Sequence, residues 1–393
     1  MSFALINRSP DLQRLRDEGH EIEIRSGHLL VHSVPYVNAS GKVARASLVS
    51  ELTMAGNVTV APGSHAISFT GDHPCHRDGR EIAQIKHVSQ TNQLAVDIVV
   101  QHSFSNKPPQ GYKDYHEKVT RYIEIISGPA CALEPDATAR TFKPIASAEE
   151  ESVFLYVDTA SSRAGIAAVT AKLAMSRVAI VGLGGTGAYL LDLVAKTPVK
   201  EIHLFDGDIF LQHNAFRAPS APSLEELEKQ PTKVAYLKSI YSKMRRNIIE
   251  RDVFISEGNM AELLTFDFVF LCFDSCPIKK LIVETLQGNA RPFIDVGLGV
   301  ELLEDSLELL ATCRVTLSSA SKQDHVARRV GFSEGDEDDL YANNIQIADL
   351  NALNAALAVI KWKKVFRFYQ DLEREHNSTY TTNCNLLTTD EVA

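Results

Sequence analysis

The residues best suited to chemistry in this chain form a glycine-rich turn. In the segment VAIVGLGGTG, Gly182 allows a sharp turn after a strand, and Gly184 lets the backbone approach a phosphate without a Cβ in the way. Gly187 lets the following helix, expected over 188–196, pack close to the sheet. That helix would direct its free N–H groups and its positive dipole end toward an anion in the turn. The pattern therefore predicts a nucleotide-binding loop.

An acidic residue and two cations follow this turn. Asp206 stands about 20 residues after the glycines, at the end of the next expected strand, where a carboxylate usually binds the ribose hydroxyls. Arg217 could grip phosphate oxygens with its fork of N–H groups, and Lys233 could meet them as a compact charge. Asp208 and Asn214 lie in the same stretch. Two cations directed at the nucleotide favour a triphosphate over a nicotinamide cofactor.

A further carboxylate is expected at the same edge of the sheet. The segment FDFVFLCFD predicts a buried parallel strand over 268–273, followed by Asp274 at the carboxyl edge where ligands of such sheets bind. A carboxylate at this position can hold Mg²⁺. We therefore expect ATP with Mg²⁺ as the cofactors and Asp274 as the metal ligand.

Ordinary structure offers an alternative for each of these residues. Lys233 could be a solvated lysine on a helix that also carries Lys238, and Arg217 could cap a turn. Asp274 could cap the helix that begins after it. The ordered combination of all of them favours the active-site interpretation.

The ordered motifs over residues 161–349 resemble the ThiF, MoeB and ubiquitin-activating enzyme superfamily. Its members adenylate the C-terminal carboxylate of a ubiquitin-like or sulfur-carrier protein with ATP. The resemblance implies that the three glycines form the nucleotide loop and that Asp206 binds the ribose. It further implies that Asn214 and Arg217 form the N-x-x-R element, that Lys233 is the phosphate lysine and that Asp274 is the metal aspartate.

The segment SSRAGI is similar to the family's entry segment, whose arginine reaches into the partner subunit's nucleotide site. This similarity implies a homodimer in which Arg163 acts in trans. Attack of a carboxylate oxygen on the α-phosphate would form a mixed anhydride and release pyrophosphate. Arg163, Arg217, Lys233 and the metal would neutralise the charge that builds on the phosphates. No general base is needed, because a carboxylate is already ionised at neutral pH.

Cysteine usage departs from the family pattern. None of the six cysteines forms a CxxC pair, so a structural zinc is not expected. The region 314–345, where many members carry a thioester cysteine, contains no cysteine. It contains Ser318, Ser319 and Ser321, Arg328 and Arg329, and the acidic run EGDEDD at 334–339. Three readings stay open: direct transfer from the adenylate, an ester on a serine or external hydroxyl, or a thioester on another cysteine. We favour direct transfer, and the candidates for a cysteine nucleophile are Cys272, Cys276 and Cys384.

Length and charge set the broad class of the protein. The 393 residues suffice for two domains, expected at 1–150 and 151–393, with a linker near 133–152. A net charge of −10 argues against a nucleic-acid partner. We expect no signal peptide or membrane span, because charges interrupt every apolar run, and we expect a cytoplasmic protein with free cysteines.

The N-terminal domain is predicted to be rich in β-strands and resembles a region of unassigned function that precedes ThiF-like domains in some bacterial proteins. Its histidines have irregular spacing, so a metal site is the less favoured interpretation; they are His65, His73, His76, His87, His102 and His116. A platform that binds the ubiquitin-like protein or a conjugating enzyme is favoured. The loop HSFSNKPPQGYKDY is the candidate contact surface, with a rigid structural loop as the alternative.

The second domain is predicted to be a Rossmann-like α/β fold with a mostly parallel sheet. Ser223 and Glu226 form a capping box, and Pro231 is expected in the first turn of the next helix. A long amphipathic helix over 345–375 is assigned to core or dimer packing, with a membrane role as the alternative. Strands are expected near 178–182, 202–206, 253–256, 267–273, 292–296 and 309–317.

Two other functions are compatible with part of the pattern. A nicotinamide-dependent oxidoreductase would also use the glycine-rich turn and Asp206. Its reaction would have no use for Arg217, Lys233 and Asp274. A catalytically silent scaffold would need no phosphate-binding set.

Overall fold

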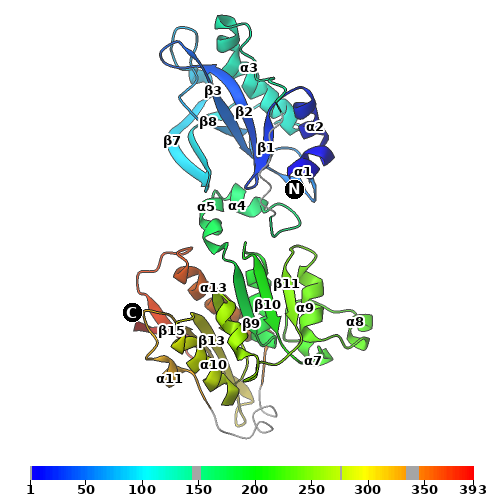
Figure 1. The fold of residues 1–393 in the computed structure, drawn as a ribbon, viewed down its shortest axis with the longest axis vertical. Coiled ribbons are helices and arrows are strands. Elements are labelled where there is room, and N and C mark those ends of the chain that lie inside the picture. Colours follow the sequence, from blue (N-terminus) through cyan, green and yellow to red (C-terminus); the bar gives the residue numbers. More distant parts are fainter. Residues whose placement is uncertain (1, 144–151, 275–276, 333–344) are drawn as a thin grey trace. The chain divides into compact units, whose positions relative to one another are not determined.

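Two large sheets, one in each half of the chain, organise the structure, and β4 and β5 form a small two-stranded sheet (Figure 1). The computed structural model describes residues 2–143, 152–274, 277–332 and 345–393. It divides into a first unit, residues 1–171, and a second unit, residues 172–393. The predictions for Cys276 and for the acidic run at 334–339 lie outside the described residues. Each unit has its own hydrophobic core, so each is described by itself.

The first unit contains a six-stranded sheet with the order β1-β2-β3-β6-β8-β7, in which all neighbours are antiparallel. The prediction of a β-rich N-terminal region is therefore confirmed. Its elements are α1 (Ser2–Arg8), α2 (Pro10–Asp17), β1 (Ile22–Arg25), β2 (His28–Val37), β3 (Val43–Glu51), β4 (Met54–Ala55), β5 (Val58–Thr59), β6 (Ala66–Phe69), η1 (Ala83–Ile85), β7 (Lys86–Ala95), β8 (Ile98–Ser105), α3 (Tyr115–Leu133), α4 (Thr159–Arg163) and α5 (Ala167–Thr170).

The 19-residue helix α3, which the sequence analysis missed, covers this sheet. Asp114 caps its N-terminus by accepting a hydrogen bond from the Glu117 N–H at 2.8 Å. Tyr115 and Tyr122 are fully buried, and the Tyr115 hydroxyl donates to the Glu51 carbonyl at 2.9 Å. Tyr112, in the preceding loop, is also buried. Both tyrosines of the candidate contact loop thus lie in the core, which favours the structural reading of that loop.

Lys118 of α3 is fully buried, and its ammonium has no carboxylate within ion-pair distance among the described residues. Its ammonium donates to the Ser50 hydroxyl at 2.8 Å and to the Ser64 carbonyl at 3.0 Å. Burial lowers the pKa of Lys118 from 10.5 to about 8, because the apolar surroundings disfavour the charged form. The folded state therefore releases this proton at a lower pH than the unfolded state does.

We expect the first unit to become more stable as pH rises from about 8 to about 10.5, since the unfolded chain binds more protons in that window. The contribution of Lys118 is about 3 kcal/mol at most. Urea unfolding of the full chain, followed by far-ultraviolet circular dichroism, should show this gain in the wild type and a smaller gain in Lys118→Met. Parallel pH profiles for the two proteins would contradict the assignment.

The second unit contains an eight-stranded sheet with the order β11-β10-β9-β12-β13-β14-β15-β16. The first four pairings are parallel and the last three are antiparallel, which confirms the predicted α/β fold with a mostly parallel sheet. Its elements are η2 (Ala171–Leu173), β9 (Arg177–Val181), α6 (Gly185–Ala195), β10 (Glu201–Phe205), α7 (Gln212–Ala215), α8 (Leu224–Glu228), α9 (Lys233–Tyr241), β11 (Ile248–Arg251), η3 (Met260–Thr265), β12 (Phe268–Leu271), α10 (Pro277–Gly288), β13 (Phe293–Leu303), β14 (Glu308–Ser318), α11 (Val326–Arg329), α13 (Ala348–Val365), β15 (Glu375–Thr381) and β16 (Leu386–Val392).

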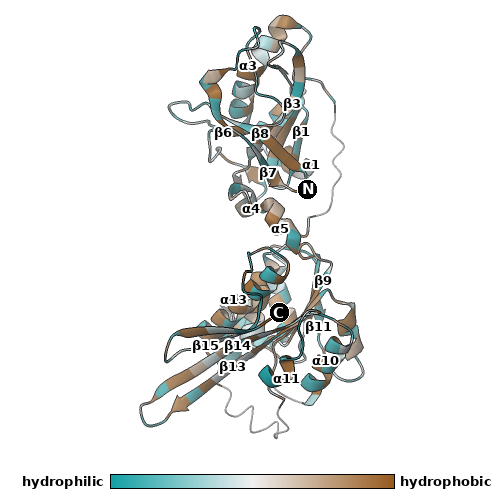
Figure 2. Ribbon diagram, turned by 90° about the vertical axis from the view of Figure 1, so that its left-hand side faces the viewer, coloured by the Kyte–Doolittle hydropathy of each residue, from teal (hydrophilic) through white to brown (hydrophobic). Residues whose placement is uncertain are grey.

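Helices cover both faces of this sheet. Residues of α6 and α13 pack with β9, β12, β13 and β14 in one apolar cluster, and residues of α10 and α11 pack with the opposite face in another. The strands are accordingly apolar where helices cover them, and β13 and β14 continue beyond the rest of the sheet as a long hairpin (Figure 2). This layering leaves the carboxyl edge of the parallel strands for a ligand.

Most strand predictions for this unit are confirmed by β9, β10, β12, β13 and β14. The prediction of a strand near 253–256 is wrong, because β11 ends at Arg251 and Phe254 is largely exposed. The β-branched pair Ile248 and Ile249 instead pairs with β10. The capping box of Ser223 and Glu226 is present, whereas Pro231 precedes the cap residue Thr232 of α9.

The predicted C-terminal helix is shorter than expected. Helix α13 ends at Val365, where Arg367 adopts a φ of 58°, and β15 begins at Glu375. Its buried residues, among them Ala355 and Trp362, pack in the core of the second unit, in agreement with the packing interpretation. Among the described residues, no helix has the length and apolar character needed to span a bilayer.

Candidate active site

Register aligns the carboxyl ends of β9, β10 and β12 at one edge of the second sheet, level with Asp295 of the longer strand β13. Val181 of β9 lies opposite Phe205 of β10 on one side and Leu271 of β12 on the other, and Leu271 lies opposite Asp295 of β13. The segments that follow these residues therefore meet at the same edge. Because β9 lies between β10 and β12, the chain order reverses here, and ligands of open α/β sheets bind at such a switch point.

The glycine-rich turn connects β9 to α6 at this edge, as predicted. Gly182 has a φ of 87°, and a Cβ at this position would lie 2.7 Å from the Cys272 carbonyl oxygen. A Cβ at Gly187 would lie 2.0 Å from the Gly182 carbonyl oxygen, because the first turn of α6 presses against the loop. These two positions accept only glycine without a shift of the backbone. Gly184 is the residue before α6, and the first-turn N–H groups of the helix follow it.

Asp206 holds this loop to the end of β10. It is almost fully buried; one carboxylate oxygen accepts a hydrogen bond from the Leu183 N–H at 2.6 Å and the other from the Asp208 N–H at 2.9 Å. Burial raises the pKa of Asp206, while the nearby Lys233 ammonium and these two N–H groups oppose that rise. The structure thus gives this carboxylate a loop-positioning task, and its predicted contact with the ribose stays a prediction.

Lys233 lies between the two acidic residues that follow β10. Its ammonium is 2.5 Å from an Asp208 carboxylate oxygen and 3.6 Å from Asp206. Only 8% of the side chain is exposed, so Lys233 is not the solvated helix lysine of the alternative interpretation. Lys238, farther along α9, is much more exposed and pairs with Glu250. The fold therefore holds one lysine of α9 at the edge of the sheet that carries the glycine-rich loop.

The N-x-x-R element forms a compact turn around α7. Asn214 is buried, and its side-chain oxygen accepts a hydrogen bond from the Leu211 N–H at 2.8 Å. Its carbonyl accepts from the Arg217 N–H at 3.1 Å. Asn214 thereby sets the backbone from which the half-buried Arg217 projects. This local role explains the spacing of the two residues without a direct contact of Asn214 with a nucleotide.

Two further residues join this site, Gln346 just before α13 and Asn351 in its first turn, and the sequence analysis missed both. Asn351 is fully buried; its side-chain oxygen accepts from the Thr186 hydroxyl at 2.9 Å, and its side-chain N–H donates to the Arg217 carbonyl at 3.4 Å. Gln346 accepts a hydrogen bond from the Gly185 N–H at 3.3 Å. The signal for Asn351 was a polar residue within the apolar pattern of a helix. Asn351 thus connects the first turn of α6 to the backbone of Arg217.

We expect Asn351→Ala to weaken ATP binding about tenfold, because it removes a hydrogen bond on each side of the link. Gly185→Ala should also weaken binding, since the added Cβ would lie 1.9 Å from the Asn351 side-chain nitrogen. In the double variant the shortened side chain makes room for the Cβ, so the combined loss should be smaller than the product of the two single losses. Calorimetric ATP titrations of the four proteins measure this coupling; independent, multiplicative losses would contradict it.

Asp274 follows β12 at the same edge and is exposed. No group of three His, Cys, Asp or Glu side chains suited to a metal ion occurs within the described ranges. A single carboxylate such as that of Asp274 is enough for Mg²⁺, because this ion usually binds through one or two carboxylates and completes its shell with phosphates and water. Asp274 therefore fits the predicted metal role when a nucleotide is bound.

Arg163 belongs to the first unit, at the end of α4, and is exposed. It is the one predicted catalytic residue that lies outside the second unit. Its role in a partner subunit stays a prediction.

The described cysteines offer little support for a thioester at this edge. Burial raises the pKa of Cys272, whose Cβ lies against the Gly187 position, and raises the pKa of Cys313 to about 11. Cys384 is exposed and lies between β15 and β16. The candidate serines begin at the far end of β14, where Ser318 lies opposite Phe293, the first residue of β13. They therefore lie at the edge of the sheet opposite the glycine-rich loop.

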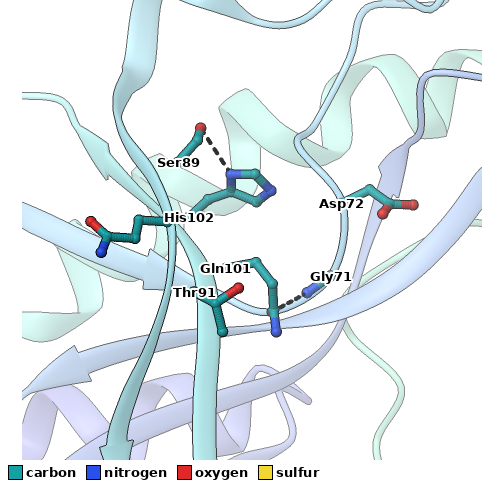
Figure 3. Close-up of a pocket in the computed structure, with 7 residues that line it drawn as sticks. Gly71, Asp72, Ser89, Thr91, Gln101 and His102 are labelled. Atoms are coloured by element: carbon teal, nitrogen blue, oxygen red, sulfur yellow. Dashed lines mark hydrogen bonds between the residues drawn. The ribbon is translucent and has the colours of Figure 1, made fainter.

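The first unit has a polar pocket of about 540 Å³, in which Ser89 and His102 of neighbouring strands approach each other (Figure 3). His102 is 3.0 Å from the Ser89 hydroxyl, and its ring contacts that of His73 edge to face at 5.2 Å. Burial lowers the pKa of His102, which favours its neutral form. The remaining lining residues are Gly71, Asp72, Gln90, Thr91 and Gln101. The histidine-rich region thus includes a polar hollow.

Comparisons with known protein families give a match for each half of the chain. Residues 160–389 match the ThiF family, and residues 10–159 match a domain of unknown function, DUF6791. The tRNA threonylcarbamoyladenosine dehydratase of Haemophilus influenzae is 28% identical over 131 residues, which cover 32% of this chain and 49% of that protein. This chain therefore spans about half the length of that curated relative.

Two solved structures show the same kind of similarity at lower identity. The structure of E. coli MccB with MccA-N7isoASN matches with a TM-score of 0.46 and 17% identity, over 57% of this chain and 66% of that chain. The structure of E. coli MccB with ATP matches with a TM-score of 0.43 and 17% identity over the same shares.

Proposed function

Because the chain belongs to the ThiF family, we propose that it uses ATP to adenylate a carboxylate and releases pyrophosphate. The observation that carries this proposal is the position of Lys233. Its buried ammonium is held by Asp208 at 2.5 Å beside the glycine-rich loop, where phosphates would lie. A buried cation at a nucleotide edge is suited to neutralise charge that develops on phosphate oxygens.

The proposed reaction is the attack of a carboxylate oxygen on the α-phosphorus. The new P–O bond forms as the bond to pyrophosphate breaks, and no proton has to be removed from the ionised carboxylate. The first-turn N–H groups of α6, together with Lys233 and Arg217, would bind the phosphates and offset their charge. Mg²⁺, held by Asp274, would supply further charge neutralisation.

We further propose that the substrate is the C-terminal carboxylate of a ubiquitin-like protein and that the enzyme acts as a homodimer. The support is the family pattern, in which an arginine placed as Arg163 is here completes the site of the partner subunit. The N-terminal unit would then bind the ubiquitin-like protein or a conjugating enzyme. Direct transfer from the adenylate is the favoured fate, because Cys272 and Cys313 are poor thiolates and the serines lie at the opposite edge.

A carboxylate carried by tRNA is a second candidate substrate. It is favoured by the similarity to a tRNA threonylcarbamoyladenosine dehydratase over 131 residues. The net charge of −10 argues against it, since binding to nucleic acid depends on basic surface.

Exchange of labelled pyrophosphate into ATP tests the proposal, with ubiquitin-like proteins encoded beside the gene and with tRNA as separate substrates. We expect exchange with a ubiquitin-like protein, a loss of about 10²-fold or more in Asp274→Asn, and little change when all cysteines are replaced by alanine. Glu284→Gln, an exposed substitution on α10, is the matched control.

Each other outcome has a distinct meaning. Exchange that requires tRNA would establish the second candidate. ATP binding without exchange by any substrate would indicate a scaffold, and tight NAD binding with indifference to Mg·ATP would indicate an oxidoreductase.

A further inference from the structure

Three charged side chains form a buried cluster beside the strand ends of the proposed site. Asp295 of β13 is fully buried between two cations. The Lys279 ammonium of α10 lies 2.6 Å from one of its carboxylate oxygens, as an ion pair that is not aligned as a hydrogen bond. The Arg314 guanidinium of β14 donates to the other oxygen at 2.6 Å. We call these three residues the charge cluster.

The charge cluster is built into the fold. Lys279 also donates to the Phe273 carbonyl at 2.8 Å, in the segment that leads to Asp274. Arg314 also donates to the Thr316 hydroxyl at 2.7 Å. Gly297 makes room for the guanidinium, since a Cβ there would lie 2.7 Å from an Arg314 nitrogen. These contacts fix both cations in place.

The charge cluster carries one net positive charge. Among the described residues, Asp295 is the one carboxylate within ion-pair distance of either cation. A buried charge without a partner is costly, so an arrangement of two cations and one carboxylate favours a bound anion. Lys279 has only 3% of its side chain exposed, whereas Arg314 has 19%. An anion that enters from solvent would therefore contact Arg314. The more deeply buried Lys279 would add positive charge without touching the anion.

Arg314 has donors left for such an anion. A guanidinium carries five N–H groups, and two of them account for the bonds to Asp295 and Thr316. The remaining donors can form the paired hydrogen bonds by which arginine binds a carboxylate. On the same face of β13, Gly299 leaves open space, since a Cβ there would meet no atom within 4 Å. An extended chain end could approach Arg314 along this face.

The charge cluster lies at the edge of the sheet that holds the glycine-rich loop. Asp295 lies opposite Leu271 of β12, which lies opposite Val181 of β9. Two strand spacings amount to roughly 10 Å. The phosphates already have the first turn of α6 and Lys233 next to β9. A mixed anhydride requires a second anion, the attacking carboxylate, beside the α-phosphate.

We infer that the charge cluster receives the carboxylate that is to be adenylated. This inference rests on the proposed function. Arg314 binds one oxygen of the incoming carboxylate, Lys279 offsets its charge, and the other oxygen attacks the α-phosphorus while pyrophosphate leaves with the electron pair of the broken bond. The same binding relieves the electrostatic repulsion between the carboxylate and the triphosphate.

The test uses the full chain with Mg²⁺, a non-hydrolysable ATP analogue and N-acetylglycine as the carboxylate probe. N-acetylglycinamide, its neutral counterpart, is the ligand control. We expect N-acetylglycine to bind in a ligand-observed NMR titration and the amide to bind at least about tenfold more weakly. Lys279→Met should weaken binding of N-acetylglycine at least about tenfold and leave the affinity for the ATP analogue unchanged within about twofold.

Lys280→Met is the matched control variant, because it removes an exposed lysine from the next position of α10. Arg314→Gln is a second test variant and should give the same loss, so a folding defect in Lys279→Met would not end the test. Unchanged N-acetylglycine affinity in both test variants would overturn the inference. So would an equal loss of affinity for the ATP analogue, since the charge cluster would then serve the phosphates. A wild type that binds no ATP analogue would instead refute the proposed function itself.

Discussion

Replacing Lys233 with methionine is expected to lower pyrophosphate exchange by about 10²–10³-fold, the usual cost of removing one positioned charge from a site where charge develops. The side chain is 8% exposed and its ammonium lies 2.5 Å from Asp208 and 3.6 Å from Asp206. Methionine keeps most of the packing volume, so the change removes mainly the charge. Exchange with a saturating carboxylate donor measures the effect.

The control for this prediction lies on the same helix. Lys238→Met removes a lysine that is 37% exposed and pairs with Glu250 on the surface, so it should change exchange less than about twofold. Lys233→Met also leaves Asp206 and Asp208 without their common cation, and its stability should be measured beside its activity. Equal exchange rates in the two variants would show that the buried position of Lys233 has no catalytic role.

The glycine-rich loop could be predicted from sequence because each glycine satisfies a requirement of the local backbone. Gly182 needs a positive φ, and Gly187 needs the absence of a Cβ. Both needs follow from the turn between a strand and a helix, so their spacing is fixed by local geometry. The pair formed by Lys233 and Asp208 is not local, because α7 and α8 lie between β10 and the helix that carries Lys233; its two members were found because both residue types suit a phosphate site.

The residues that the sequence analysis missed reach the site from distant segments. Asn351 lies in a helix that follows the loop by more than 150 positions, and its contact with Thr186 depends on how α13 packs against α6. Asp295 and Arg314 meet through the register of β13 and β14. Such pairings depend on tertiary packing, and a polar residue inside an apolar element was their only signal.

The errors in secondary structure have the same origin. Helix α3 was missed because its sequence is rich in β-branched and aromatic residues, whose strand preference the packing of Tyr115 and Tyr122 overrides. The predicted helix over 345–375 was too long because Arg367 turns the chain after α13, and the polar segment beyond it pairs with β14. Local propensity could not decide either case.

Alanine at two positions of the loop should separate folding from nucleotide binding. Gly187→Ala should lower the free energy of unfolding of the second unit by about 3 kcal/mol, because its Cβ would lie 2.0 Å from the Gly182 carbonyl oxygen and the loop must move. ATP binding should be lost with it. Urea unfolding followed by the fluorescence of Trp362, the single tryptophan of the chain, reports on this unit.

Gly184→Ala should behave differently, because the nearest atom to its Cβ, the Gln346 side-chain oxygen, is 3.9 Å away and the residue has a φ of −63°. The fold can accept this methyl group, so stability should change by less than about 1 kcal/mol. A phosphate bound in the loop would clash with the methyl group, so ATP affinity should fall at least about tenfold. Gly288→Ala, at the open end of α10, is the control: it should leave ATP affinity unchanged and raise stability by about 1 kcal/mol at most, since alanine favours a helix. If Gly184→Ala kept full ATP affinity, the phosphates would have to lie elsewhere than against this turn, and the chemistry assigned to Lys233 would lose its geometric basis.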